Sequence, residues 1–238
     1  MDFIKETWSE KDFEELRQYE MMIKGSEHDC EWEQRIVNTK LDCVGRTSSK
    51  AREVVKQIKK GNYIDFLEKI EIKTHFESIV SAYLINGIKD FKIYEKCLDR
   101  LILTVDNWAS VDVLKFEKID KEKLVYLSDK FLKSDKPFAR RLGVNFWFEL
   151  IKDEKYISSA FKILDGLALE KEYYVNMSGA WLLAECMTKN REKTLEYFEN
   201  SKTNDFVINK AISKCRDSFR ISDDDKNYLL RFKIKAKK

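Results

Sequence analysis

Hydrophobic and polar positions repeat with a helical period from the first residues to the last, and no segment has the alternation of a convincing β-hairpin. Capping boxes are predicted where Ser9 precedes Asp12 by three residues and where Thr74 precedes Glu77 by the same interval. The pattern therefore indicates an all-α protein. Further terminal signals are the predicted N-caps Asn62, Asp120, Ser222 and the Ser48-Ser49 pair, and a predicted C-cap at Gly61.

The predicted helices group into pairs that recur along the chain. Pairs begin near residues 48, 75, 108, 138, 173 and 204, an interval of roughly 31 residues. This interval lies within the range of solenoid units, in which one helix of each pair lines a concave face that can hold a long ligand. The spacing favours a helical-repeat solenoid, and an irregular helical bundle is the alternative.

Composition agrees with one compact helical body. The chain of 238 residues is 43% hydrophobic and 37% charged and has 7 Gly and 1 Pro, which excludes disordered and fibrous classes. No Gly-, Ser- or Pro-rich stretch divides the chain, so we expect a single domain over residues 1–238. The net charge of +3 is too small to indicate a nucleic-acid binder by itself, so a basic surface requires local segregation of charge.

The cysteines and apolar runs favour a cytoplasmic protein that does not enter a membrane. Five Cys residues without a C-x-x-C pair argue against a disulfide framework or a zinc ribbon. The N-terminus lacks the apolar core of a signal peptide, and the longest charge-free stretch, residues 173–184, is too short for a membrane span. Phosphate-loop, dinucleotide, nucleophile-elbow and zinc-protease motifs are missing, so we expect no cofactor and no metal.

Two segments place a tryptophan at an unusual helical position. Trp108 and Asp112 are four residues apart, so they share one face of a helix predicted over 108–117, with the carboxylate in mid-helix. Trp181 lies on a polar flank, outside the seam of its own helix. The plain alternatives are a solvated surface Asp112 and a Trp181 that only packs on the next repeat. The predicted seam consists of Tyr173, Met177, Ala180, Ala184 and Met187.

A third segment, residues 136–152, is predicted as a helix opened by Pro137, where the missing N–H costs nothing. Arg141 falls on its polar face and Arg140 on the opposite side, near Trp147. A guanidinium binds phosphate through two hydrogen bonds, although a solvated arginine is the plain alternative. The predicted polar face consists of Arg141, Asn145, Glu149 and Lys152.

These segments resemble one family. The string DNWASVD at residues 106–112 resembles the W-x-x-x-D motif of bacterial alkylpurine DNA glycosylases of the AlkD type, which are built on HEAT-like helical repeats. FARRLGV is similar to the arginine helix of that family, YYVNMSGAWLLAE to the helix with its second tryptophan, and NKAISKCRDSFRISDDDK to the terminal segment of its broader branch. The order is kept over most of residues 8–230.

The resemblance implies a HEAT-like solenoid that removes positively charged 3- or 7-alkylpurines from duplex DNA. It implies that Asp112 is the catalytic carboxylate near the deoxyribose and that Trp108 and Trp181 hold the lesion. It assigns the DNA-binding arginine to Arg141, with Arg140 as the alternative. We further expect a monomer whose partner is alkylated duplex DNA.

The residue types in these segments suit the cleavage of an N-glycosidic bond. Cleavage of an N-glycosidic bond builds positive charge on the sugar, and a nearby carboxylate lowers the energy of that charge. An alkylated purine already carries the charge that makes it a good leaving group, so no general acid is needed. The three segments contain no histidine that could act as such an acid, since His28 and His75 both lie outside them.

Basic residues that could neutralise phosphates gather in several stretches. The pairs Lys210/Lys214 and Arg216/Arg220 have i, i+4 spacing, so each is predicted to form a ridge on a helix. The basic tail is expected to be disordered. The other basic candidates are Lys56, Lys59 and Lys60, then Lys133 and Lys136, and in the tail Arg231, Lys233, Lys235, Lys237 and Lys238.

The first repeat departs from the family pattern. Where the broader branch reads G-V-R-x-P-x-L-R, this chain has GRTSSKAR and keeps only Gly45 and Arg52 in register. This difference favours the first alternative function, a DNA-binding or damage-sensing repeat protein without catalysis. The second alternative is a protein-interaction scaffold, which should not bind duplex DNA.

Overall fold

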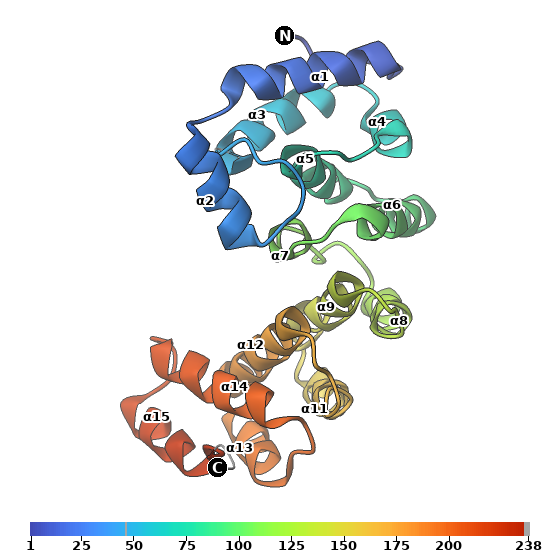
Figure 1. The fold of residues 1–238 in the computed structure, drawn as a ribbon. Coiled ribbons are helices and arrows are strands. Elements are labelled where there is room, and N and C mark those ends of the chain that lie inside the picture. Colours follow the sequence, from blue (N-terminus) through green and yellow to red (C-terminus); the bar gives the residue numbers. More distant parts are fainter. Residues whose placement is uncertain (46, 236–238) are drawn as a thin grey trace. The chain divides into compact units, whose positions relative to one another are not determined.

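The computed structural model describes residues 1–45 and 47–235, and within these ranges the regular elements are helices. The single β feature there is an isolated bridge between Asp42 and Thr74. The all-α prediction is therefore confirmed. The chain divides into two compact units, which we call unit 1 (Met1–Lys118) and unit 2 (Ile119–Lys238) (Figure 1).

Unit 1 contains seven α-helices in its described residues. Their bounds are α1 Glu10–Ile23, α2 Glu27–Val37, α3 Thr47–Ile58, α4 Tyr63–Lys69, α5 His75–Ile85, α6 Phe91–Thr104 and α7 Trp108–Asp112.

Unit 2 contains the remaining helices, two of them short 3₁₀ turns. Their bounds are α8 Lys121–Leu132, α9 Pro137–Asn145, α10 Trp147–Leu150, η1 Glu154–Tyr156, α11 Ile157–Asp165, α12 Tyr173–Lys189, α13 Arg191–Asn200, α14 Asp205–Asp217, α15 Asp223–Leu229 and η2 Leu230–Phe232.

The predicted pair starts agree with the structure to within one residue, at the first residues of α3, α5, α7, α9, α12 and α14. These helices also pack on one another in sequence order. In unit 1, α5 contacts both α3 and α7, and in unit 2, α12 contacts both α9 and α14. Successive packing of equivalent helices is what a repeat protein requires. The solenoid itself stays a prediction.

Most predicted helix starts are confirmed because their signals are local. The Thr74 hydroxyl accepts from Glu77 N–H at 3.1 Å and the Glu77 carboxylate accepts from Thr74 N–H at 3.2 Å, which is a complete capping box. Ser9 and Asp12 form a second box. Asn62 and Ser222 also accept hydrogen bonds at helix starts, whereas the Asp120 side chain accepts no backbone N–H of the helix that it precedes.

Two terminal predictions are wrong. Ser48 and Ser49 do not cap α3, because the helix already begins at Thr47. Gly61 is not the C-cap of α3, which ends three residues earlier at Ile58. Gly61 is instead required by a close approach of the N-terminal segment, since a Cβ there would lie 2.3 Å from the carbonyl oxygen of Lys5.

Each unit has its own apolar core. In unit 1, the Trp8 ring lies 5.4 Å from the ring of Phe13 and 4.8 Å from the ring of Phe66. In unit 2, α12 is buried around most of its circumference, because α9, α13 and α14 all pack on it. A single seam along α12 was therefore the wrong expectation, and Tyr173 at its predicted start is 52% exposed.

Candidate functional site

Trp108 and Asp112 are the first and last residues of α7, a helix of only five residues. Both side chains are half-buried. The i, i+4 relation is confirmed, but the predicted helix over 108–117 is too long and Asp112 is not in mid-helix. Asp112 therefore lies at the C-terminal end of the helix, one turn from Trp108.

The C-terminal end of α7 is set by a side chain from the end of α5. Asn86 donates from Nδ2 to the carbonyl oxygen of Val113 at 2.9 Å, and its Oδ1 accepts from the backbone N–H of Lys115 at 2.8 Å. These bonds take up backbone groups directly after Asp112. Helix α7 is thus fixed from outside, as a five-residue helix must be.

The N-terminal end of α7 rests on a buried polar network. Asn107 is fully buried and its Oδ1 accepts from the backbone N–H of Ser110 at 3.0 Å and from the Ser110 hydroxyl at 3.1 Å. The Ser110 hydroxyl lies 2.7 Å from that of Ser78, whose oxygen in turn lies 2.7 Å from the carbonyl oxygen of His75. His75 lies outside the predicted segments, yet the fold connects it to α7. Burial lowers the pKa of His75.

Trp108 is also tied to α2. Its indole Nε1 donates to the carbonyl oxygen of Ile36 at 3.1 Å. Just before α7, the Asp106 carboxylate accepts from the Thr39 hydroxyl and from the backbone N–H of Lys40, the latter at 2.7 Å. Contacts from α2, α5 and the loop after α2 therefore fix the ring of Trp108 and the backbone that carries Asp112.

A basic cluster that the sequence did not reveal lies in the same unit. Burial and the positive charges of Lys118 and Lys115 lower the pKa of Lys59. The ammonium groups of Lys115 and Lys118, in the segment after α7, are therefore close enough to Lys59 to act on it electrostatically. Lys59 was a candidate, but its neighbours could not be found from sequence because about 56 residues separate them. Concentrated positive charge near α7 suits a phosphate.

In unit 2, Trp181 is 41% exposed, so its predicted position outside the core is confirmed. Its ring lies 4.9 Å from the ring of Phe148. The Nζ of Lys214 lies 5.5 Å from the Trp181 ring centroid, a cation–π distance. Lys210 and Lys214 both belong to α14, which confirms their helical spacing.

Arg216 and Arg220 do not form the predicted ridge, because α14 ends at Asp217 and Arg220 lies beyond it. The Arg220 guanidinium instead makes an ion pair with Glu185, with Nη1 3.0 Å from Oε2. Glu185 is one turn from Trp181 on α12. Lys214 thus lies over the Trp181 ring, and Arg220 is held by a carboxylate one turn further along α12.

The two consecutive arginines have different environments from those predicted. Arg141 is only 5% exposed, and its Nη1 donates to the carbonyl oxygen of Tyr174 at 2.5 Å. Asn145 is 4% exposed and accepts from the Ser178 hydroxyl at 2.6 Å. The predicted polar face at Arg141 and Asn145 is therefore an interface with α12, not a solvent face.

Arg140 is held by a structural ion pair. Its Nε and Nη2 donate to the two carboxylate oxygens of Glu170 at 2.7 and 3.1 Å. Its Nη1 donates to the carbonyl oxygens of Ser134 and Asp135 at 3.0 and 2.9 Å. Four of the five guanidinium N–H groups are therefore engaged.

The basic tail is ordered as far as the structure describes it, so the expectation of a disordered end is wrong for that part. Asn209 donates to the carbonyl oxygen of Ile234 at 2.9 Å and accepts from its N–H at 3.0 Å. The Arg231 guanidinium lies over the ring of Tyr228 at 4.8 Å. Lys237 and Lys238 lie outside the described residues.

The described residues hold neither a candidate metal site nor a candidate membrane span. No group of three or more His, Cys, Asp or Glu side chains there could hold a metal ion. Nor does any helix in the described ranges have the length and apolar character needed to cross a membrane.

Comparison with protein families gives one match. A family model described as DNA alkylation repair enzyme matches residues 16–215, which include Trp108, Asp112, Arg141 and Trp181. The match covers most of the chain and extends over both units. A search of curated proteins finds no match.

Proposed function

Since the chain belongs to the DNA alkylation repair enzyme family, we propose that it is a DNA glycosylase that excises 3- or 7-alkylpurines from duplex DNA. The observation that carries this proposal is the fixation of α7, which holds Trp108 and Asp112 one turn apart through contacts from α2 and α5. A site that must stabilise a transition state needs groups that are fixed before the substrate arrives.

In the proposed reaction, Asp112 stabilises charge and transfers no proton. The bond between the deoxyribose and the alkylated purine breaks, the bonding electrons leave with the cationic base, and the sugar gains oxocarbenium character. The Asp112 carboxylate lowers the energy of that positive charge, and water then adds to the sugar and releases its extra proton to the bulk solvent. The purine leaves as a neutral base, so the reaction requires no general acid.

Trp108 and Trp181 are proposed to hold the damaged nucleotide. The indole of Trp108 is fixed by its bond to Ile36, and that of Trp181 by Phe148. Aromatic rings stack on sugars and bases without selecting a sequence. The proposal requires both units to act on the same DNA, as one domain over residues 1–238, which the extent of the family match supports.

The proposed contacts with the DNA backbone come from both units. The contacts in unit 2 are those predicted from the sequence, namely Lys210, Lys214, Arg216 and Arg220. To these we add the unit 1 cluster of Lys59, Lys115 and Lys118. For Arg141, direct contact with DNA remains a prediction, and its bond to Tyr174 supports a role in holding α12. For Arg140, the alternative, the two bonds to Glu170 and a side chain only 18% exposed support a structural role, whereas Arg220 pairs with Glu185 but is 58% exposed.

The decisive experiment measures release of alkylated purines from methylated duplex DNA by the wild type and by Asp112→Asn. The substitution keeps the shape of the side chain and removes its charge, so base release should fall by about 10² to 10³ with DNA binding retained. Asp224→Asn, an exposed carboxylate in α15, is the matched control and should act as the wild type does.

The possible results distinguish a glycosylase from a non-catalytic DNA-binding protein and from a protein-interaction scaffold. A wild type that binds duplex DNA but releases no base is a binding or damage-sensing member of the family. A wild type that binds no duplex at any salt concentration supports the protein scaffold. Equal loss of activity in Asp112→Asn and Asp224→Asn would contradict the assigned role of Asp112.

A further inference from the structure

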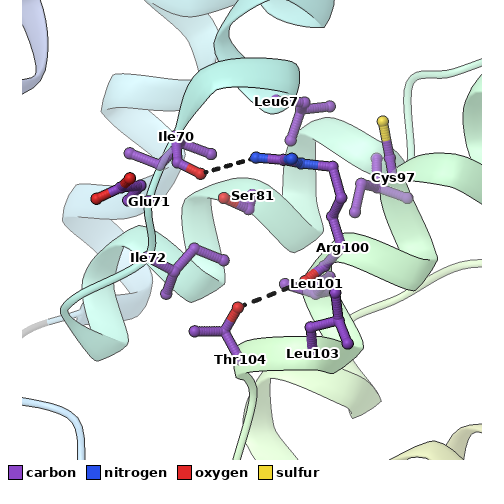
Figure 2. A pocket seen from close by; sticks show the side chains of 11 residues that line it. Leu67, Ile70, Glu71, Ile72, Ser81, Cys97, Arg100, Leu101, Leu103 and Thr104 are labelled. Atoms are coloured by element: carbon purple, nitrogen blue, oxygen red, sulfur yellow. Dashed lines mark hydrogen bonds between the residues drawn. The ribbon is translucent and has the colours of Figure 1, made fainter. Parts of the chain in front are cut away.

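A pocket of about 260 Å³ opens in unit 1 between the end of α4, α5 and α6 (Figure 2). Neither Trp108 nor Asp112 lines it, so it is separate from the candidate site. Its walls are mainly aliphatic, and the apolar lining includes Leu67, Ile70, Ile72, Ile85, Leu101 and Leu103.

One part of the pocket is polar, and its hydrogen-bonding groups do not all have partners. Ser81 on α5 is 2% exposed, and its hydroxyl has no hydrogen-bond partner within the described part of the chain. Arg100 on α6 donates from Nη2 to the carbonyl oxygen of Ile70 at 3.3 Å. Figure 2 shows the Ser81 hydroxyl and the Arg100 guanidinium both directed toward this carbonyl, with Ile72 and Leu103 on the other side of the pocket.

The Arg100 charge is not balanced by an ion pair. No described carboxylate lies within ion-pair distance of its guanidinium, and Glu71 at the rim lies 4.0 Å from the ammonium group of Lys73. The remaining N–H groups of Arg100 can therefore donate to a ligand. A buried hydroxyl without a partner costs free energy, and a ligand that accepts from it removes that cost.

We infer that this pocket binds a small carboxylate with an apolar body. The carboxylate accepts from the Arg100 guanidinium and the Ser81 hydroxyl, and the apolar body lies against the aliphatic walls. Pockets for drug-sized ligands measure about 300 to 1,000 Å³, so 260 Å³ suits a smaller molecule. This inference does not depend on the proposed glycosylase activity.

The test uses octanoate as the probe and octan-1-ol, which has the same chain length without the charge, as its control. Binding to the full chain is measured by calorimetry, and the affected residues are located by backbone amide chemical shifts. Octanoate should bind at least tenfold more tightly than octanol, with shift changes confined to α4, α5 and α6. Arg100→Gln should weaken octanoate binding at least tenfold, because it removes the charged donor.

Two further variants separate binding from folding. Lys96→Gln removes a cation one turn away on α6, where the ammonium pairs with Glu68 at 2.7 Å, and should leave octanoate binding unchanged. Ser81→Ala removes the unpartnered hydroxyl, so the protein should melt at a higher temperature without octanoate and gain less from it. The inference is overturned if octanoate does not bind at millimolar concentration. It is also overturned if octanol binds equally well, or if Arg100→Gln and Lys96→Gln behave alike.

Discussion

The side-chain amide of Asn86 holds the carbonyl oxygen of Val113 at 2.9 Å, directly beyond the carboxylate that we propose as catalytic. The same amide accepts from Lys115 N–H at 2.8 Å. Because α7 has only five residues, its position depends on such contacts from neighbouring helices. The geometry of Asp112 is therefore a property of unit 1 and not of the motif alone.

Replacing Asn86 by Ala should reduce base release about tenfold or more, because the Val113 carbonyl and the Lys115 N–H lose their partner and the end of α7 is released. Binding to undamaged duplex DNA should change by less than about threefold. Steady-state release and fluorescence anisotropy measure the two quantities.

Asn209→Ala provides a matched control for this substitution. Asn209 makes the same two-bond clamp, on Ile234 in unit 2. Both variants should lose similar stability, about 1 to 2 kcal/mol, but only Asn86→Ala should lose activity. Equal activity losses would show that general destabilisation, and not the position of Asp112, explains the effect.

Stability should fall as pH rises because of a buried carboxyl in α1. Glu20 is 3% exposed, and burial followed by the charge of Glu77 raises its pKa to about 8. Its folded pKa lies above the usual value of 4.5, so its contribution is fully present below about pH 4.5 and is lost between pH 4.5 and 8.

Glu20→Gln should remove most of this dependence and make the protein about 2 kcal/mol more stable than the wild type at pH 8.5. Urea unfolding at several pH values between 5 and 9 measures it. Glu14→Gln, an exposed carboxylate in the same helix, should leave the pH dependence unchanged. A wild-type stability that rises over this range would disprove the assignment.

Arg140 should contribute to stability rather than to DNA affinity. Its pair with Glu170 has two bonds and exposed side-chain fractions of 18% and 10%, so Arg140→Gln should cost about 2 kcal/mol. The salt dependence of DNA binding should not change. The pair of the exposed Arg191 with Asp225 is the comparison, and Arg191→Gln should cost less stability than Arg140→Gln. A reduced salt slope in Arg140→Gln would instead restore this residue as a phosphate contact.

The basic cluster of unit 1 should contact phosphates. Lys115→Gln and Lys118→Gln should each reduce the slope of log K against log salt by about 1, and weaken binding to all sequences alike. Each substitution should also raise the pKa of Lys59, since it removes a positive neighbour. Lys193→Gln, whose ammonium pairs with Glu154 at 3.4 Å in unit 2, should leave the slope unchanged. An unchanged slope in all three variants would remove the cluster from the interface.

The sequence alone determined where helices begin, because an N-cap and its partner three residues later are in contact in any fold. The Thr74 and Glu77 box was found for this reason, whereas the six pair starts rest on the wider hydrophobic pattern and agree to within one residue. It also determined that Trp108 and Asp112 share a helix face, since that relation lies within a single turn, and that Trp181 is partly exposed.

Only the tertiary structure decided where α7 ends and what the arginines contact. Val113 and Leu114 continue an apolar helical pattern, but Asn86 takes the backbone bonds that a longer helix would use. Helical projection places Arg141 on a polar face without knowing that α12 covers that face, and it cannot show that Glu170 engages Arg140. Contacts between residues about 30 apart depend on how helices pack, and a local pattern carries no information about that packing.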